Sequence, residues 1–176
     1  MERHRGHTLP EMLLAVALVA MTLGYGIPAF RTLGLDTART REVNTFVHAL
    51  YLARSEAIKR NGVVSLCPSH DGNLCAAAGT PWHSGWIVFI NRDRDQPAVR
   101  DPDEDLLHVY SGWAAGSVFA NRTTLSFRPF GQSGTTATFT FCDRRGDRFA
   151  RAVIISQTGR PRISGSGSSG TPLRCA

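Results

Sequence analysis

The segment Gly159-Arg160-Pro161-Arg162 has the clearest chemical potential in this chain. Residues two apart in an extended segment project to the same side, and proline favours an extended backbone, so the two guanidinium groups are expected side by side. A guanidinium donates two parallel hydrogen bonds to a phosphate or a carboxylate. The pattern therefore indicates a pair of side chains that binds two phosphates of double-stranded DNA, largely without reading base sequence.

The basic residues of the chain are almost all arginines. The 176 residues include 20 Lys and Arg against 14 Asp and Glu, and Lys59 is the single lysine. Residues 142–176 carry seven arginines and two aspartates, so the C-terminal end is strongly basic. We expect several of these arginines to surround Arg160 and Arg162; the alternative is that the motif lies in a solvated tail or contacts another subunit. The candidates are Arg144, Arg145, Arg148, Arg151 and Arg174.

Four cysteines offer two kinds of chemistry. The thiolates and imidazoles of Cys67, His70, Cys75 and His83 are suitable ligands for zinc. In an oxidising compartment, nearby thiols form disulfides instead. We favour disulfides, because the apolar segment described below directs these residues to such a compartment. The expected pairs are Cys67 with Cys75 and Cys142 with Cys175.

The sequence contains no constellation for catalysis. It has no G-x-S-x-G, H-E-x-x-H or P-loop signature. Oxygen-bearing side chains alternate in residues 91–105 in a way that suggests calcium, but the glycine and closing glutamate of an EF-hand are missing from the required offsets. Three arginines, Arg92, Arg94 and Arg100, also neutralise half of the acidic charge there. We expect a solvated loop at this place, no metal, no cofactor and no enzymatic activity.

A stretch of nineteen uncharged, mostly apolar residues, 12–30, precedes all of these groups. As a helix it covers about 28 Å, close to the hydrocarbon thickness of ~30 Å in a bilayer. Arg3 and Arg5 come before it, so the positive-inside bias leaves the N-terminus in the cytoplasm. We expect a single-pass inner-membrane anchor with a periplasmic C-terminal domain. A cleaved secretory signal and a buried core helix are the alternatives.

The segments after the anchor indicate one helix followed by strands. Apolar residues at helical spacing continue through 31–61, so the anchor and this amphipathic stretch predict one long helix. Residues 62–156 predict an antiparallel β-domain, and the order of elements predicts an α+β fold. The Gly/Ser-rich residues 157–176 predict a flexible, basic tail. The expected strands are 63–67, 86–90, 106–110, 117–120, 124–127, 137–142 and 152–156.

The N-terminus resembles the processing signal of type IV pilins and type II secretion pseudopilins. A basic leader, residues 1–6, ends in Gly6 and is followed by HTLPEMLLAVALVAMTLGYGIPAF. With His7 as the first mature residue, Glu11 is the fifth and Pro28 the twenty-second, as expected in that family, although the family usually has phenylalanine first. The resemblance implies cleavage by a prepilin peptidase after Gly6, N-methylation, and pairing of Glu11 with the N-terminal amine of an adjacent subunit.

The rest of the chain resembles the GspH/FimT group of minor pilins and pseudopilins. The matching stretches are LYLARSEAIKRN, SLCPSHDG, GWIVFINRDRD, FCDRRG and ARAVIISQTGRPRI. The resemblance implies a type IV pilin-like fold that assembles with other pilin or pseudopilin subunits into a filament. The segment 159–162 is similar to the G-R-x-R element of FimT-like members, which implies a DNA receptor for natural transformation. The alternative is a structural GspH- or FimU-like tip subunit, in type II secretion or pilus assembly, that does not bind DNA.

The intact mass of the chain extracted from membranes tests the N-terminal processing. We expect loss of six residues and a methyl group on His7, because Gly6 closes the basic leader. A mature chain that begins after Ala17 or Ala20 would instead establish a secreted protein. Glu11→Ala should keep membrane insertion, since the segment becomes more apolar, but it should impair incorporation into filaments.

Overall fold

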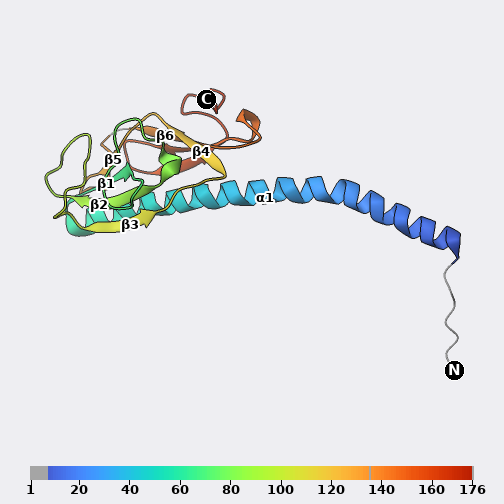
Figure 1. Ribbon diagram of the computed structural model, residues 1–176. Helices are drawn as coiled ribbons and strands as arrows, with labels where there is room; N and C mark the ends of the chain where they lie inside the picture. Colours follow the sequence, from blue (N-terminus) through green and yellow to red (C-terminus); the bar gives the residue numbers. More distant parts are fainter. Residues whose placement is uncertain (1–7, 135, 176) are drawn as a thin grey trace. The chain divides into compact units, whose positions relative to one another are not determined.

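The computed structural model describes residues 8–134 and 136–175, and within them the chain forms one long helix followed by eight strands (Figure 1). The helix α1 spans Leu9–Arg60. The chain divides into two compact units, Met1–Ala38 and Arg39–Ala176, so α1 contributes to both. The strands and all of the candidate binding residues except those of the N-terminal signal belong to the second unit.

The described part of the first unit is the apolar end of α1. Among the described residues, α1 is the one helix long and apolar enough to cross a membrane, judged by length and composition. Its most apolar window buries none of its side chains within the protein, and Leu14, Val16 and Met21 are each about two-thirds exposed. A helix satisfies its own backbone hydrogen bonds, so such a surface suits a lipid environment. The length, apolar composition and exposed surface of this part of α1 are those expected of the membrane anchor predicted at residues 12–30.

The second unit is built on a buried stripe of α1. Ala49, Ala53 and Ala57 follow one another at intervals of four residues and have no exposed surface. Residues at this spacing share one helix face, and their small side chains let strands approach the helix closely. Phe46, one turn earlier, is buried with its ring centroid 4.5 Å from that of Phe139 in the sheet. The helix therefore supplies the centre of the hydrophobic core.

The strands form two antiparallel sheets of four strands each within the described residues. The first sheet has the order β3-β2-β1-β5, and the second has the order β4-β6-β7-β8. Each of the seven expected strands is present with its ends within one residue, and the α+β fold is confirmed. The strands are β1 Val63–Pro68, β2 Trp86–Asn91, β3 Leu106–Tyr110, β4 Gly116–Ala120, β5 Leu125–Phe127, β6 Ala137–Asp143, β7 Arg151–Ile155 and β8 Pro161–Ser164.

The second sheet uses its two faces differently. Side chains alternate along a strand, so neighbouring residues of β7 point to opposite faces. Val153 and Ile155 join the core cluster that includes Phe46, whereas Ile154 packs in a separate cluster with Leu173 from the C-terminal segment. The face directed away from α1 is thus partly covered by the end of the chain.

The C-terminal segment differs from the flexible tail expected for 157–176. Pro161–Ser164 forms β8 and pairs with β7, with Arg162 opposite Ile154. Further along, Ser166 and Pro172 form an isolated β-bridge. Glycine and serine make few apolar contacts, which suggested flexibility. Here the ordering comes from backbone pairing with β7 instead, and this pairing depends little on the side chains.

Both expected disulfides are present in the structure. Cys67 is bonded to Cys75 and Cys142 to Cys175, with Cα–Cα distances of 5.5 Å and 5.9 Å. The sulfurs of Cys67 and Cys75 are therefore not available as zinc ligands. His83 accepts a hydrogen bond from the backbone of Val118, with Nδ1 at 3.3 Å from the nitrogen. No group of three His, Cys, Asp or Glu in the part of the chain described here is placed to hold a metal ion.

The disulfide Cys142–Cys175 generates a prediction about stability. Its cysteines are 33 residues apart, and the loop-entropy model gives about 3 to 4 kcal/mol for closing a loop of this size. Cys175→Ser should lower the free energy of unfolding by about that amount, measured by urea unfolding of the full chain in detergent. Hydrogen exchange should accelerate in β8 more than in β1, because β8 lies inside the closed loop.

Cys142→Ser serves as the matched control, since it opens the same loop from the other side. The two single variants and the double variant should lose similar stability. Hydrogen exchange in Cys175→Ser could instead accelerate as much in β1 as in β8. That result would show that the bridge supports the whole domain rather than the C-terminal segment.

Candidate functional site

Arg160 and Arg162 lie where β7 turns into β8. The turn is closed by a hydrogen bond from the Gly159 nitrogen to the Ser156 carbonyl (2.8 Å). Gly159 has a φ of +72°, and a side chain at this position would collide with the carbonyl of Gly131. Glycine is therefore required both by the backbone conformation and by the close packing of the two loops.

The two arginine side chains project to the same face of the second sheet. Arg162 is opposite Ile154, which faces away from the core centred on α1. Pairing continues to Arg160, whose carbonyl accepts a hydrogen bond from the Ser156 nitrogen (3.4 Å), so Arg160 lies on the same side as Arg162. Both are exposed, and neither takes part in an ion pair within residues 8–134 and 136–175.

The other arginines expected in this patch lie at the opposite end of β7. The strand β7 begins at Arg151, and Arg162 pairs with Ile154, three residues further along β7. Three residues of a strand span about 10 Å, so Arg162 lies about that far along the strand from Arg151. The β6–β7 connection and the end of the chain meet near Arg151, because Arg174 lies 3.4 Å from Asp147. The strand register thus divides the basic residues into two groups. The second group comprises Arg144, Arg145, Arg148, Arg151 and Arg174.

We expected Arg145 to support DNA binding, but its side chain is committed to Asp143. Nη2 donates to Asp143 Oδ2 (2.6 Å) and Nε donates to Oδ1 (3.0 Å), while the guanidinium lies 4.2 Å from the centre of the Phe149 ring. Arg39 of α1 also donates to Asp143 Oδ2 (3.5 Å) and to the carbonyl of Phe149. These residues form a largely buried ion cluster that joins α1 to the second sheet.

The ion cluster has a clear effect on the titration of Asp143. The side-chain hydrogen bond from Arg145 lowers the pKa of Asp143 most, and burial opposes it. The backbone nitrogen of Arg145 and the charges of Arg145 and Arg39 lower this pKa further. The net direction is downward, so the carboxylate is held in its charged form.

A second polar contact joins α1 to the first sheet. The Tyr110 hydroxyl donates to the carboxylate of Glu42. Burial raises the pKa of Glu42, although the charge of Arg41 acts in the opposite direction. Each sheet is therefore tied to the helix by a polar contact in addition to the apolar core.

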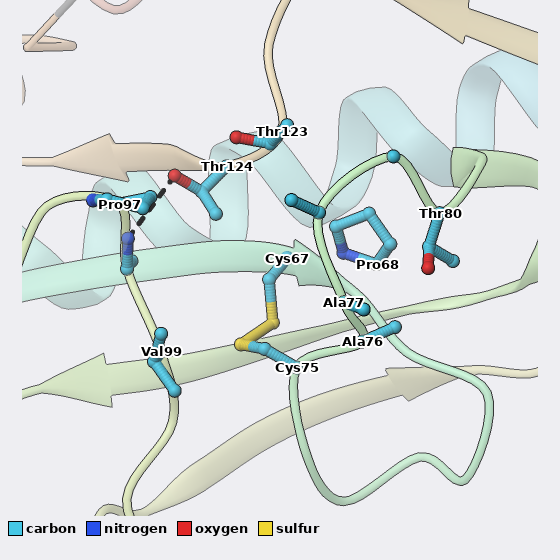
Figure 2. Close-up of a pocket in the computed structure, with 13 residues that line it drawn as sticks. Cys67, Pro68, Cys75, Ala76, Ala77, Thr80, Pro97, Val99, Thr123 and Thr124 are labelled. Carbon is cyan, nitrogen blue, oxygen red and sulfur yellow. Dashed lines mark hydrogen bonds between the residues drawn. A yellow bond between two sulfur atoms is a disulfide. The ribbon is translucent and has the colours of Figure 1, made fainter.

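An apolar pocket of about 320 Å³ lies beside the Cys67–Cys75 disulfide, as Figure 2 shows. Its lining includes no ionisable side chain, and its polar groups are threonines and backbone. Thr124 Oγ1 accepts a hydrogen bond from the Ala98 nitrogen at 3.3 Å. The pocket offers no residue for acid–base catalysis. The lining consists of Cys67, Pro68, Cys75, Ala76, Ala77, Ala78, Gly79, Thr80, Pro97, Ala98, Val99, Thr123 and Thr124.

The sequence patterns did not single out Phe130, which lies near the β7–β8 turn. It is 85% exposed and lies in a turn closed by a hydrogen bond from the Gly131 nitrogen to the Arg128 carbonyl (2.8 Å). The order Arg-Pro-Phe-Gly is typical of a β-turn, with proline second and glycine fourth. That signal could have located the turn, but it could not show that the aromatic ring faces solvent.

Comparison with known proteins identifies the family. Residues 42–159, more than half of the chain, match the family model described as Type II transport protein GspH. The chain is 33% identical over 171 residues to the pilin-like protein PilA1 of Thermus thermophilus, a match that covers 90% of this chain and 97% of PilA1. The chain therefore belongs to the GspH family of minor pilins and pseudopilins.

Solved structures agree on the fold. Two crystal structures of the type IV minor pilin FimU from Pseudomonas aeruginosa superpose with TM-scores of 0.56 and 0.54, each at 23% identity. The matches cover 84% and 80% of this chain and nearly all of FimU, 99% and 98%. The solved structures thus support the fold, and the family match makes the chain a minor pilin or pseudopilin. Members of this family are structural, non-enzymatic subunits that associate with other pilins. The N-terminal apolar helix of this chain fits a membrane-anchored subunit.

The Asp143 ion cluster generates a prediction about pH. Asp143→Asn should lower the free energy of unfolding at neutral pH by about 3 to 5 kcal/mol, because the buried guanidinium of Arg39 and the largely buried one of Arg145 lose their counter-charge. The folded-state pKa of Asp143 is depressed, so its stabilisation is present above the unfolded value of about 3.9 and is lost as pH falls through the folded-state pKa. The difference in the free energy of unfolding between the wild type and Asp143→Asn should therefore become smaller at acidic pH. Urea unfolding of both proteins across a pH series measures this difference.

Asp147→Asn is the matched control. Asp147 lies in the same connection but is substantially exposed, and its ion pair with Arg174 is on the surface. This variant should change stability by less than about 1 kcal/mol at any pH. Equal losses in the two variants would contradict the role assigned to the buried cluster.

Proposed function

We propose that this chain is a minor pilin that binds double-stranded DNA without sequence preference and presents it for uptake in natural transformation, as FimT-like members do. The observation that carries the proposal is the placement of Arg160 and Arg162. Both are exposed on one face at the edge of the second sheet, and neither is neutralised by an acid within the described residues.

The chemistry of this pair suits a phosphate backbone. Residues two apart in a strand are about 6 to 7 Å apart, so the guanidiniums can bind separate anionic groups. The turn at Gly159 is packed against Gly131, which limits the freedom of the backbone that carries them. Guanidinium–phosphate bonds carry no base information, so such a site would bind DNA without distinguishing one sequence from another.

The filament context follows from the N-terminal segment. We infer a leader at 1–6, a membrane helix at 7–30 in the inner membrane, its amphipathic continuation at 31–61, a periplasmic β-domain at 62–156 and a basic C-terminal segment at 157–176. Gly6 and His7 lie outside the described residues. Glu11 is described, and its carboxylate accepts a hydrogen bond from the Thr8 nitrogen at 3.4 Å.

The salt dependence of DNA binding tests the proposal. The full chain in neutral detergent should bind a fluorescent duplex weakly, and its affinity should fall steeply as salt is raised. In a plot of the logarithm of the binding constant against the logarithm of the salt concentration, Arg160→Ala and Arg162→Ala should each reduce the steepness of the slope by about one unit. Each variant removes one phosphate contact. Lysine at both positions should restore part of the binding, since charge returns without the planar fork.

Arg148→Ala is the matched control, because Arg148 is exposed on the β6–β7 connection at the opposite end of β7. This variant should leave the slope nearly unchanged. Unchanged binding in the Arg160→Ala, Arg162→Ala double variant would show that the motif is not the site. A wild-type chain that binds no DNA at low salt would count against the proposal. If pilus assembly or secretion also depended on residues 159–162, the result would support a structural tip subunit instead.

A further inference from the structure

The loop between β5 and β6 holds an aromatic ring in solvent on a well-fixed backbone. Phe130, at the tip of this loop, is 85% exposed. The carbonyl of the next residue, Gly131, accepts a hydrogen bond from Arg54 Nε of α1 (2.9 Å), and a side chain at Gly131 would collide with Ile58. The same carbonyl packs against Gly159. The ring is therefore presented by a loop that is anchored on two sides, and no part of the core requires it there.

A groove with arginines in its lining runs along the same loop. It has a volume of about 550 Å³, and its lining includes the exposed Arg94 and Arg128 but no acidic side chain. Neither of these arginines forms an ion pair within the residues that the structure describes. Among the described residues, the lining is Val63, Arg94, Gln96, Ser126, Arg128, Pro129 and Gly134.

The acids next to Arg94 in the sequence are engaged in their own loop. Asp95 accepts hydrogen bonds from Asn91 Nδ2 (2.8 Å) and from the Val99 nitrogen (2.9 Å). Asp93 accepts a hydrogen bond from the Asp95 nitrogen (3.2 Å). Both carboxylates thus stabilise the turn that presents Arg94, and neither is within ion-pair distance of it among the described residues.

Arg128 and Pro129 line the groove, and Phe130 is the next residue of the same loop. Arg128 and Phe130 belong to one turn, and the following Gly131 packs on Gly159, the neighbour of Arg160. Exposed cations beside an exposed aromatic ring are the combination that binds single-stranded nucleic acid, where phosphates contact the cations and a base stacks on the ring. In a duplex interior the faces of the bases are covered by their neighbours, so the ring would add little there.

We propose that this groove binds a single strand of DNA, with phosphates on Arg94 and Arg128 and an unpaired base stacked on Phe130. The inference rests on the proposed function, because Arg160 and Arg162 hold the adjacent duplex. It extends that function: the chain binds a frayed end or single-stranded stretch of the DNA that it captures through the arginine pair.

The test compares two probes on the full chain in neutral detergent. The probes are a fluorescent oligo-thymidine of about 16 nucleotides and a blunt duplex of the same length. Phe130→Ala should weaken binding of the single strand about tenfold and binding of the duplex less than twofold. Phe119→Ala is the matched control, since Phe119 is a partly exposed phenylalanine on β4, and it should change neither.

Phe130→Trp gives a direct readout of stacking. The three native tryptophans, Trp82, Trp86 and Trp113, are buried, so a new exposed tryptophan dominates any fluorescence change. Its emission should be quenched by the single strand and much less by the duplex. This variant also keeps the claim testable if Phe130→Ala is poorly folded.

The outcomes separate this inference from the proposed function. Duplex binding that depends on Arg160 and Arg162, together with single-strand binding indifferent to Phe130 and no quenching, would overturn only the groove. No binding of either probe by the wild type would overturn both. Unchanged DNA binding in Phe130→Ala with loss of incorporation into filaments would assign the ring to a contact with another subunit and would also overturn the inference.

Discussion

The second unit depends on the burial of one stripe of α1 between two sheets. Phe46 contacts the rings of Trp82, Trp86, Phe139 and Phe141, so strands from both sheets meet on a single helical side chain. The alanines that follow it let the strands approach without voids. The β5–β6 loop and the β7–β8 turn are positioned by this packing, because the same helix holds the β5–β6 loop, against which the turn packs.

Charge in this interface limits how the helix and the second sheet can align. Apolar surfaces tolerate small shifts, whereas Asp143 must meet both Arg39 and Arg145. A shift by one residue would leave a buried charge without its partner, at a cost of several kcal/mol. The cluster therefore selects one alignment, and it explains why two adjacent arginines, Arg144 and Arg145, have different roles: one is exposed and the other completes the fold.

The sequence predicted most of the fold because its local signals agree with the tertiary structure. Strands such as β2 and β6 are runs of β-branched or aromatic residues bounded by turn residues. The uncharged apolar run of residues 12–30 likewise predicts the membrane anchor. β8 could not be predicted in this way, since Pro161–Ser164 is held by backbone pairing within a Gly/Ser-rich stretch. The division of the basic residues also escaped prediction, because it depends on strand register, which local composition does not encode.

The Cys142–Cys175 disulfide has a mechanical consequence for a filament subunit under load. From the β7–β8 turn, the chain reaches β6 by two covalent routes: backward through β7, and forward through β8 and the bridge to Cys142. Tension applied at the turn is shared between these routes, so the segment that follows β8 stays covalently connected to β6 even when β8 is loaded. An edge strand is ordinarily the first part of a sheet to separate, whereas the closed loop connects β8 covalently to the sheet through both of its ends.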